Sequence, residues 1–142
     1  PALKCIGFYG TYTYTHTRVN NFNFEGRENE KDLSLPGSPE HTANASLYFE
    51  KKGLNVRLSY NYASSFIDEM GEVAALDRYY DAVSYMDLNA SYTFGKKIKT
   101  TFYADATNLL NQPLRYYQGT KDRTMQSEHY GVKINAGVKV NF

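Results

Sequence analysis

The sequence predicts an all-β fold, a transmembrane antiparallel β-barrel or a part of one. Three observations support this prediction. Apolar and polar side chains alternate over stretches of about nine to eleven residues, the length of a strand that crosses a bilayer at the tilt of a barrel. The connections between these stretches are short and long in turn, and aromatic residues gather near the ends of the stretches.

The composition agrees with such a barrel and excludes several other classes. The 142 residues include 14 Tyr and 8 Phe but no Trp, and no apolar run approaches the roughly 18–20 residues of a membrane-spanning helix. Alternating strands conceal their hydrophobicity from an average, so the mean hydropathy of -0.60 does not exclude a membrane barrel. Sixteen basic and 15 acidic residues give no indication of nucleic-acid binding. The single cysteine, Cys5, can form no internal disulfide.

Six strands are expected, and each has one apolar and one polar face. They occupy residues 5–19, 42–50, 54–62, 86–94, 98–107 and 130–142. In the first strand, Ile6, Phe8 and Tyr12 share a face that is opposite a row of threonines. The last strand alternates most regularly. Its apolar face comprises Tyr130, Val132, Ile134, Ala136, Val138, Val140 and Phe142.

The connections alternate in length. Those at 51–53 and 95–97 are tight-turn signals that contain glycine, whereas those at 20–40, 64–84 and 108–127 are about twenty residues long. Soluble sheets rarely place such long loops at every second connection. Outer-membrane barrels have short turns on the periplasmic side and long loops outside the cell. The long connections are therefore predicted to be extracellular loops.

Aromatic residues of the apolar faces form two groups under this topology, as expected for rings at the two membrane interfaces. The extracellular group comprises Tyr12, Tyr14, Tyr60, Tyr62 and Tyr130. The periplasmic group comprises Phe49, Tyr92, Phe94 and Phe142. Phe102, in the middle of its strand, does not fit either group.

Several segments occur in an order that is familiar from one family. They are LPGSPEHTAN at 35–44, YMDLNASY at 85–92, TNLLN at 107–111, YQG at 117–119 and the terminal strand at 131–142. The set resembles the late strands of TonB-dependent outer-membrane receptors and covers roughly the last 110 residues of the chain.

The resemblance implies a 22-stranded barrel that is plugged by an N-terminal domain and energised through TonB. Residues 1–142 would then be the C-terminal part of the barrel domain, about six strands, without the plug and the earlier strands. The implied function is uptake of a scarce nutrient of the iron-siderophore, haem, cobalamin or glycan class. The implied partners are outer-membrane lipid, the plug domain of the same protein, the TonB complex through the missing N-terminal region, the barrel-assembly machinery and a small nutrient ligand.

Candidate site residues fall in three groups. Cations lie beside aromatic residues in the predicted extracellular loops, where they could contact a ligand or pack loop against loop. This group comprises Arg78, Tyr79, Tyr80, Arg115, Tyr116, Tyr117 and Arg123. Charged residues of the polar faces could contact the plug or be solvated inside the barrel. This group comprises Arg57, Asp105, Lys133 and Lys139. Phe142 could anchor a signal that the assembly machinery reads by edge pairing, or could simply end a strand.

Two other functions stay open at this point. A soluble ligand-binding barrel or sandwich would turn the apolar faces inward, and a small outer-membrane barrel enzyme would need a convergent nucleophile and base. No recognisable catalytic motif is present, and His16, His41 and His129 lie far apart without metal-ligand spacing. No catalytic residue, metal site or cofactor is therefore expected.

Overall fold

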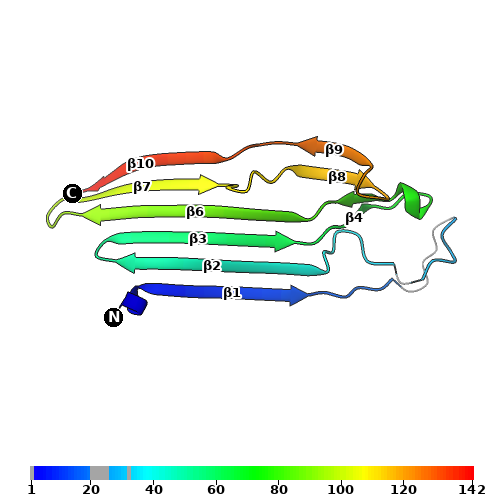
Figure 1. Cartoon of the computed structure of the whole chain (residues 1–142), viewed down its shortest axis with the longest axis horizontal. Helices are drawn as coiled ribbons and strands as arrows, with labels where there is room; N and C mark the ends of the chain where they lie inside the picture. The colour runs from blue at the N-terminus through cyan, green and yellow to red at the C-terminus, as the bar shows by residue number, and fades with distance from the viewer. Residues whose placement is uncertain (1, 20–25, 32) are drawn as a thin grey trace.

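The computed structural model describes residues 2–19, 26–31 and 33–142. A large antiparallel sheet has the strand order β1-β2-β3-β6-β7-β10, and a small sheet with the order β4-β5-β8-β9 continues beyond one end of it (Figure 1). The strands of the large sheet are β1 (Ile6–Tyr14), β2 (His41–Lys51), β3 (Leu54–Ala63), β6 (Val83–Phe94), β7 (Lys99–Thr107) and β10 (Lys133–Asn141). Those of the small sheet are β4 (Phe66–Glu69), β5 (Arg78–Tyr80), β8 (Leu114–Gln118) and β9 (Thr124–Glu128).

Helical structure is limited to two short 3-10 turns in the described part of the chain. These are η1 (Ala2–Cys5) and η2 (Ala74–Leu76). None of the helices in the described residues has the length and apolar character needed to cross a membrane. The prediction of an all-β, antiparallel fold is therefore confirmed. Closure into a barrel is not seen in this sheet, because β1 and β10 are its two unpaired edges.

Short and long connections lie at opposite ends of the large sheet, as the sequence predicts. The β2–β3 and β6–β7 turns lie at the end that also holds η1, and the long connections lie at the other end (Figure 1). Lys52, Gly53 and Gly95 adopt positive φ angles of 48°, 85° and 96° in the two turns. A left-handed backbone closes such tight turns, which explains the glycines there.

The long connections are more ordered than the predicted loops. Residues 64–84 and 108–127 contain β4, β5, β8 and most of β9, so the expectation that they are loops is wrong for much of their length. These strands are only three to five residues long, and β5 pairs with β8 from a different connection. Segments this short show no measurable alternation. Residues 20–25 and 32 of the first long connection lie outside the described residues.

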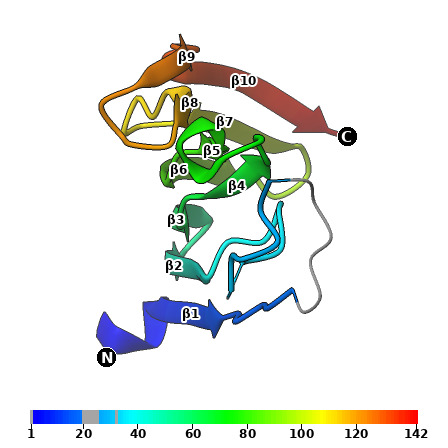
Figure 2. The same ribbon diagram turned by 90° about the vertical axis from the view of Figure 1, so that its right-hand side faces the viewer.

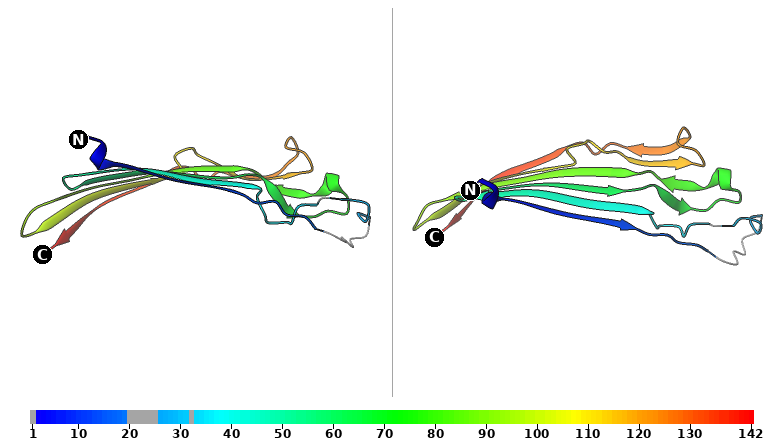
Figure 3. Two further views of the ribbon diagram at one scale, coloured as in Figure 1. Left: turned by 90° about the horizontal axis from the view of Figure 1, so that it is seen from below. Right: turned by 60° about the horizontal axis from the view of Figure 1, so that its bottom comes forward.

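The register of the large sheet separates an apolar face from a polar face. One row of residues opposite each other across the strands consists of Phe8, Leu47, Leu58, Leu88, Ala106 and Ile134. The sheet is a single curved layer (Figures 2 and 3), and no second layer covers this row: Phe8, Leu47 and Ile134 are 71%, 50% and 72% exposed. The inner residues Leu58, Leu88 and Ala106 are half-buried by their neighbours in the sheet. The buried hydrophobic residues of the described chain, Ile67 and Tyr117, lie in the small sheet. A sandwich with the apolar face inside is therefore not what the described residues form.

The register also places two aromatic residues differently from the sequence prediction. Phe102 lies opposite Tyr92, and its ring centroid is 5.8 Å from that of Phe94, so it belongs to the aromatic group near the short turns. Strand β10 begins at Lys133, three residues later than predicted, after Gly131 with a φ of 75°. The expectation that Tyr130 is part of this strand is therefore wrong. The first strand likewise ends at Tyr14 and not at residue 19.

The turn glycines give a test of the fold. A Cβ at Gly53 would lie 2.2 Å from the carbonyl oxygen of Thr93, whereas a Cβ at Gly37, whose φ is 77°, would meet nothing within 4 Å. Both Gly53→Ala and Gly37→Ala incur the left-handed penalty of about 1–3 kcal/mol. We expect Gly53→Ala to lose about 1–3 kcal/mol more, because backbone must move. Denaturant unfolding of the full-length protein measures the difference, and equal losses would contradict this account.

Candidate functional site

The polar face of the large sheet carries the charged residues that the sequence singled out. Arg57, Asn89 and Asp105 lie opposite one another on β3, β6 and β7, in a row that also includes Tyr48 and Asn135. Lys133 lies opposite Thr107, and Lys139 opposite Thr101, on the same face. Arg57 and Asp105 therefore lie in the same row, separated only by Asn89 on β6. Lys133 and Lys139 lie near opposite ends of β10.

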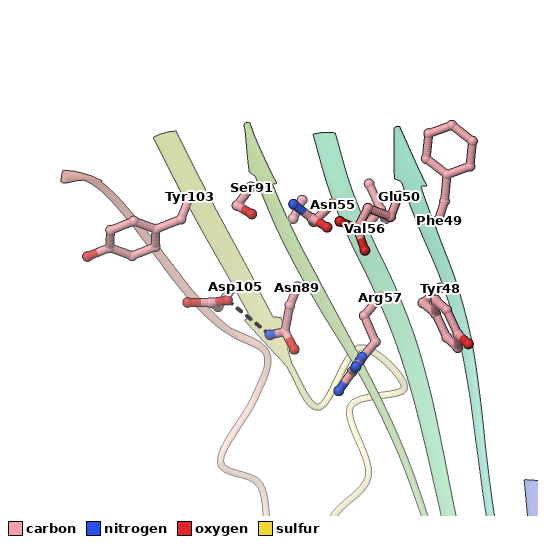
Figure 4. A pocket seen from close by; sticks show the side chains of 11 residues that line it. Tyr48, Phe49, Glu50, Asn55, Val56, Arg57, Asn89, Ser91, Tyr103 and Asp105 are labelled. Atoms are coloured by element: carbon pink, nitrogen blue, oxygen red, sulfur yellow. Dashed lines mark hydrogen bonds between the residues drawn. The ribbon is translucent and has the colours of Figure 1, made fainter. Parts of the chain in front are cut away.

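A shallow pocket of about 430 Å³ lies around this row, and we call it the Arg57 pocket. Arg57, Asn89 and Asp105 project from the same side of the sheet, and Asp105 Oδ1 accepts a hydrogen bond of 2.9 Å from Asn89 Nδ2 (Figure 4). The Arg57 guanidinium forms no ion pair or hydrogen bond within the described residues. Glu50 also lines the pocket. The pocket thus offers one unpaired cation between carboxylates, an arrangement suited to a polar partner.

Aromatic rings of the candidate loop residues pack against one another in the small sheet. The ring centroids of Tyr79 and Tyr117 lie 5.1 Å apart, with planes only 4° from parallel. Tyr80 and Tyr116 meet edge to face at 5.2 Å. Burial raises the pKa of Tyr80 to about 12 and that of Tyr79 in the same direction, so both phenols are neutral at physiological pH. The four predicted tyrosines therefore do come together, because those of the second long connection pack against those of the third.

The guanidinium groups of this region are engaged within the protein. Arg78 donates to Asp68 and Glu69 at 2.5 and 2.9 Å, and these contacts, the Asp68 hydrogen bond first, raise the pKa of Arg78. Arg115 pairs with Asp81 at 2.6 Å and lies 5.8 Å above the ring of Tyr117. These bonds leave the arginines less free for a ligand than the sequence suggested.

Arg123 joins the third long connection to the second. Its guanidinium donates to Gln118 Oε1 at 2.9 Å and to the carbonyl oxygen of Ala75 at 3.2 Å. The backbone N–H of Gly119 donates to the carbonyl of Asp77 at 2.9 Å. The two connections are thus tied by both side-chain and backbone hydrogen bonds.

A buried ion pair that the sequence analysis missed links the first long connection to the second. Arg27 and Asp77 are each 1% exposed and form a two-pronged contact of 2.5 and 3.0 Å. Glu30 also receives two hydrogen bonds from Arg27, at 2.9 and 2.7 Å, and Arg27 donates to the carbonyl of Gly71 at 3.1 Å. Hydrogen bonds to both carboxylates raise the pKa of Arg27. Fifty residues separate the pair, so no local pattern indicates it.

Metal-ligating side chains do not gather in the described part of the chain, where no group of three or more His, Cys, Asp or Glu could hold an ion. His41 instead accepts or donates a 2.7 Å hydrogen bond with the hydroxyl of Tyr12 and packs 5.2 Å from the ring of Tyr14. Phe142 follows β10 with its side chain fully exposed.

Comparison with known families adds one finding. The model of a family described as TonB-dependent receptor-like β-barrel matches residues 4–109, which is most of the chain. The matched range contains β1–β7 and the whole Arg57 pocket. No curated protein and no solved structure matches the chain.

The buried pair predicts an asymmetry between two arginines. Arg27→Met would leave Asp77 buried and uncompensated, and we expect the long connections to lose about 3–5 kcal/mol of local stability. Arg78→Met, whose side chain is 40% exposed, should cost at most about 1 kcal/mol. Hydrogen exchange of the connections in the full-length protein measures both effects. Similar protection in the two variants would show that the Arg27 contact does not hold the connections together.

Proposed function

The chain belongs to the TonB-dependent receptor-like β-barrel family, and from this premise we propose that it forms part of a receptor that takes up a scarce nutrient with energy supplied through TonB. The family consists of outer-membrane receptors and transporters, not of enzymes. The match over residues 4–109 is the observation that carries the proposal. The nutrient would be an iron-siderophore, haem, cobalamin or a glycan, and the chain would be the C-terminal part of the barrel domain.

The two faces of the large sheet support a position in the bilayer wall. An exposed apolar row is unfavourable in water but is favoured against lipid. The inner strands β2, β3, β6 and β7 pair with a neighbour on both sides, as lipid requires, and the edges of β1 and β10 would pair with the rest of the barrel. We therefore propose that Leu47, Leu58 and Leu88 contact outer-membrane lipid.

The polar face would then line the lumen and meet the plug domain. The unpaired guanidinium of Arg57 supports this assignment, because a plug segment that carries a carboxylate or amide oxygen could accept hydrogen bonds from it. Asp105 has only one of its oxygens in a hydrogen bond with the described residues, so it could accept from the same segment. Lys139, on β10, could likewise donate hydrogen bonds to an oxygen of the plug domain.

The small sheet would form an extracellular rim. Its ion-paired arginines and packed tyrosines support a rigid entrance to the barrel. The shape of this entrance would then select the nutrient, because the arginines are already engaged with carboxylates. At the opposite end, Phe142 follows the unpaired edge strand β10. A free strand edge suits recognition by the barrel-assembly machinery through strand addition, with Phe142 as its aromatic anchor.

Neighbouring residues on β3 test which face meets lipid. Leu58 lies in the apolar row, and Ser59 lies on the polar face. We expect Leu58→Arg to destabilise the full-length protein in bilayers by about 2–4 kcal/mol, whereas Ser59→Arg should cost far less. Unfolding in lipid vesicles measures both. A larger loss for Ser59→Arg would reverse the assignment of the faces.

Uptake assays test the transport function. Deleting the gene that encodes the full-length protein should abolish uptake of one labelled solute among a ferric siderophore, haem, cobalamin and an oligosaccharide. Deleting TonB should have the same effect on that solute, because transport would depend on the inner-membrane energy source. Unchanged uptake of all four solutes after the gene is deleted would refute the proposal for these nutrient classes.

A further inference from the structure

A second pocket, of about 300 Å³, lies where β6, β7 and β10 meet the long connections, and we call it the Lys133 pocket. It shares no lining residue with the Arg57 pocket. Two of the motifs noted in the sequence meet here: YMDL contributes Tyr85 and Asp87, and TNLLN contributes Thr107 and Asn108. Tyr130 and Lys133 line the pocket from the third side.

Asn108 fixes one wall of the Lys133 pocket. With a φ of 57°, it donates its backbone N–H to Asp87 Oδ1 at 2.9 Å. Its side-chain amide donates to the carbonyl oxygens of Gln112 and Gly131, at 3.1 and 3.2 Å, and accepts the N–H of Gln112 at 2.8 Å. These bonds join β6, the connection after β7, and the residues before β10. Asn108 is therefore occupied within the protein, and its hydrogen bonds hold this wall of the pocket in place.

Two opposite charges line this pocket, and neither forms an ion pair with another described residue. Asp87 accepts the Asn108 N–H through Oδ1, and Oδ2 has no hydrogen-bond partner in the described residues. The Lys133 ammonium has neither an ion pair nor a hydrogen bond in that part of the chain, so it does not pair with Asp87. The pocket thus offers a free acceptor and a free donor, and its charged lining residues sum to zero.

Aromatic rings add an apolar surface to this polar wall. Tyr130 donates its hydroxyl to Glu128 Oε2, which raises the pKa of Tyr130, and its side chain stays 61% exposed. The hydroxyl is thus engaged, while the ring is open to contact. Tyr85 provides a second ring on the β6 side.

We infer that the Lys133 pocket is a binding subsite for a neutral, hydroxyl-rich group of the sugar class. A hydroxyl both donates and accepts, so neighbouring hydroxyls can donate to Asp87 and accept from Lys133, whereas the C–H face of a sugar ring packs against Tyr130. Because the charges of Asp87 and Lys133 offset each other, the pocket has no net attraction for an anion or a cation, and its acceptor and donor suit a neutral group. The inference rests on the proposed uptake function and names the class of solute.

Binding measurements on the purified full-length receptor test this assignment. The probes are maltotriose, cellotriose, xylotriose and mannotriose, with ferric citrate as an anionic comparison, each titrated by calorimetry. We expect one trisaccharide to bind and Lys133→Gln to weaken it about tenfold or more, because a charged hydrogen bond is lost. Lys99→Gln is the matched control, since Lys99 lies on the same face at the other end of β7 and should change nothing.

A second pair of variants separates the ring from the hydroxyl of Tyr130. Tyr130→Phe should keep trisaccharide binding within about twofold, and Tyr130→Ala should weaken it about threefold to tenfold. Equal effects of Lys133→Gln and Lys99→Gln would overturn the subsite. Binding of ferric citrate but of no trisaccharide would overturn the sugar class. If TonB-dependent uptake of another solute persists in that case, the transport function stands and only this inference fails.

Discussion

The register of the large sheet is the constraint on which the rest of the structure depends. From β1 to β10 the described pairings run without a shift, so the apolar side chains of each strand lie opposite those of its neighbours and one face stays apolar across the whole sheet. A slip by one residue in any strand would move its apolar side chains to the polar face. The two turns help to prevent that slip. Their left-handed residues fix a short turn, and the length of the turn sets how the two strands that it joins are paired.

Stability has different sources in the two sheets. The large sheet is one layer, and its apolar residues gain nothing from burial unless an apolar solvent covers them. The small sheet contains the irregular pairings and its own buried residues, Ile67 and Tyr117, and Asp77 of the buried Arg27–Asp77 pair lies directly before β5. One part of the molecule is thus organised by its surroundings, and the other by internal packing.

The chemistry of the site follows the same division. Charged side chains of the small sheet neutralise one another, as Arg115 and Asp81 do at 2.6 Å. On the polar face of the large sheet, Arg57 and Lys133 form no ion pair with any acidic side chain of the described residues, so their charges are available there to another molecule. Free charge on a rigid element binds with little reorganisation. The polar face is therefore where recognition is favoured.

The sequence by itself determined the long strands, their two faces, the short turns and the family, because alternation and turn glycines are local signals that need no knowledge of distant partners. It also grouped the charged residues on the polar face correctly. Only the tertiary structure decided that β5 pairs with β8, that Arg27 meets Asp77, and that Phe102 joins the aromatic group near the turns. It also decided that Tyr130 lies beside Lys133 before the last strand begins. The β5–β8 pairing, the Arg27–Asp77 pair and the position of Phe102 all depend on how strands align in space, which no local pattern in the sequence specifies. Tyr130 was misplaced because a single left-handed residue, Gly131, interrupts an alternation that the sequence continues through it.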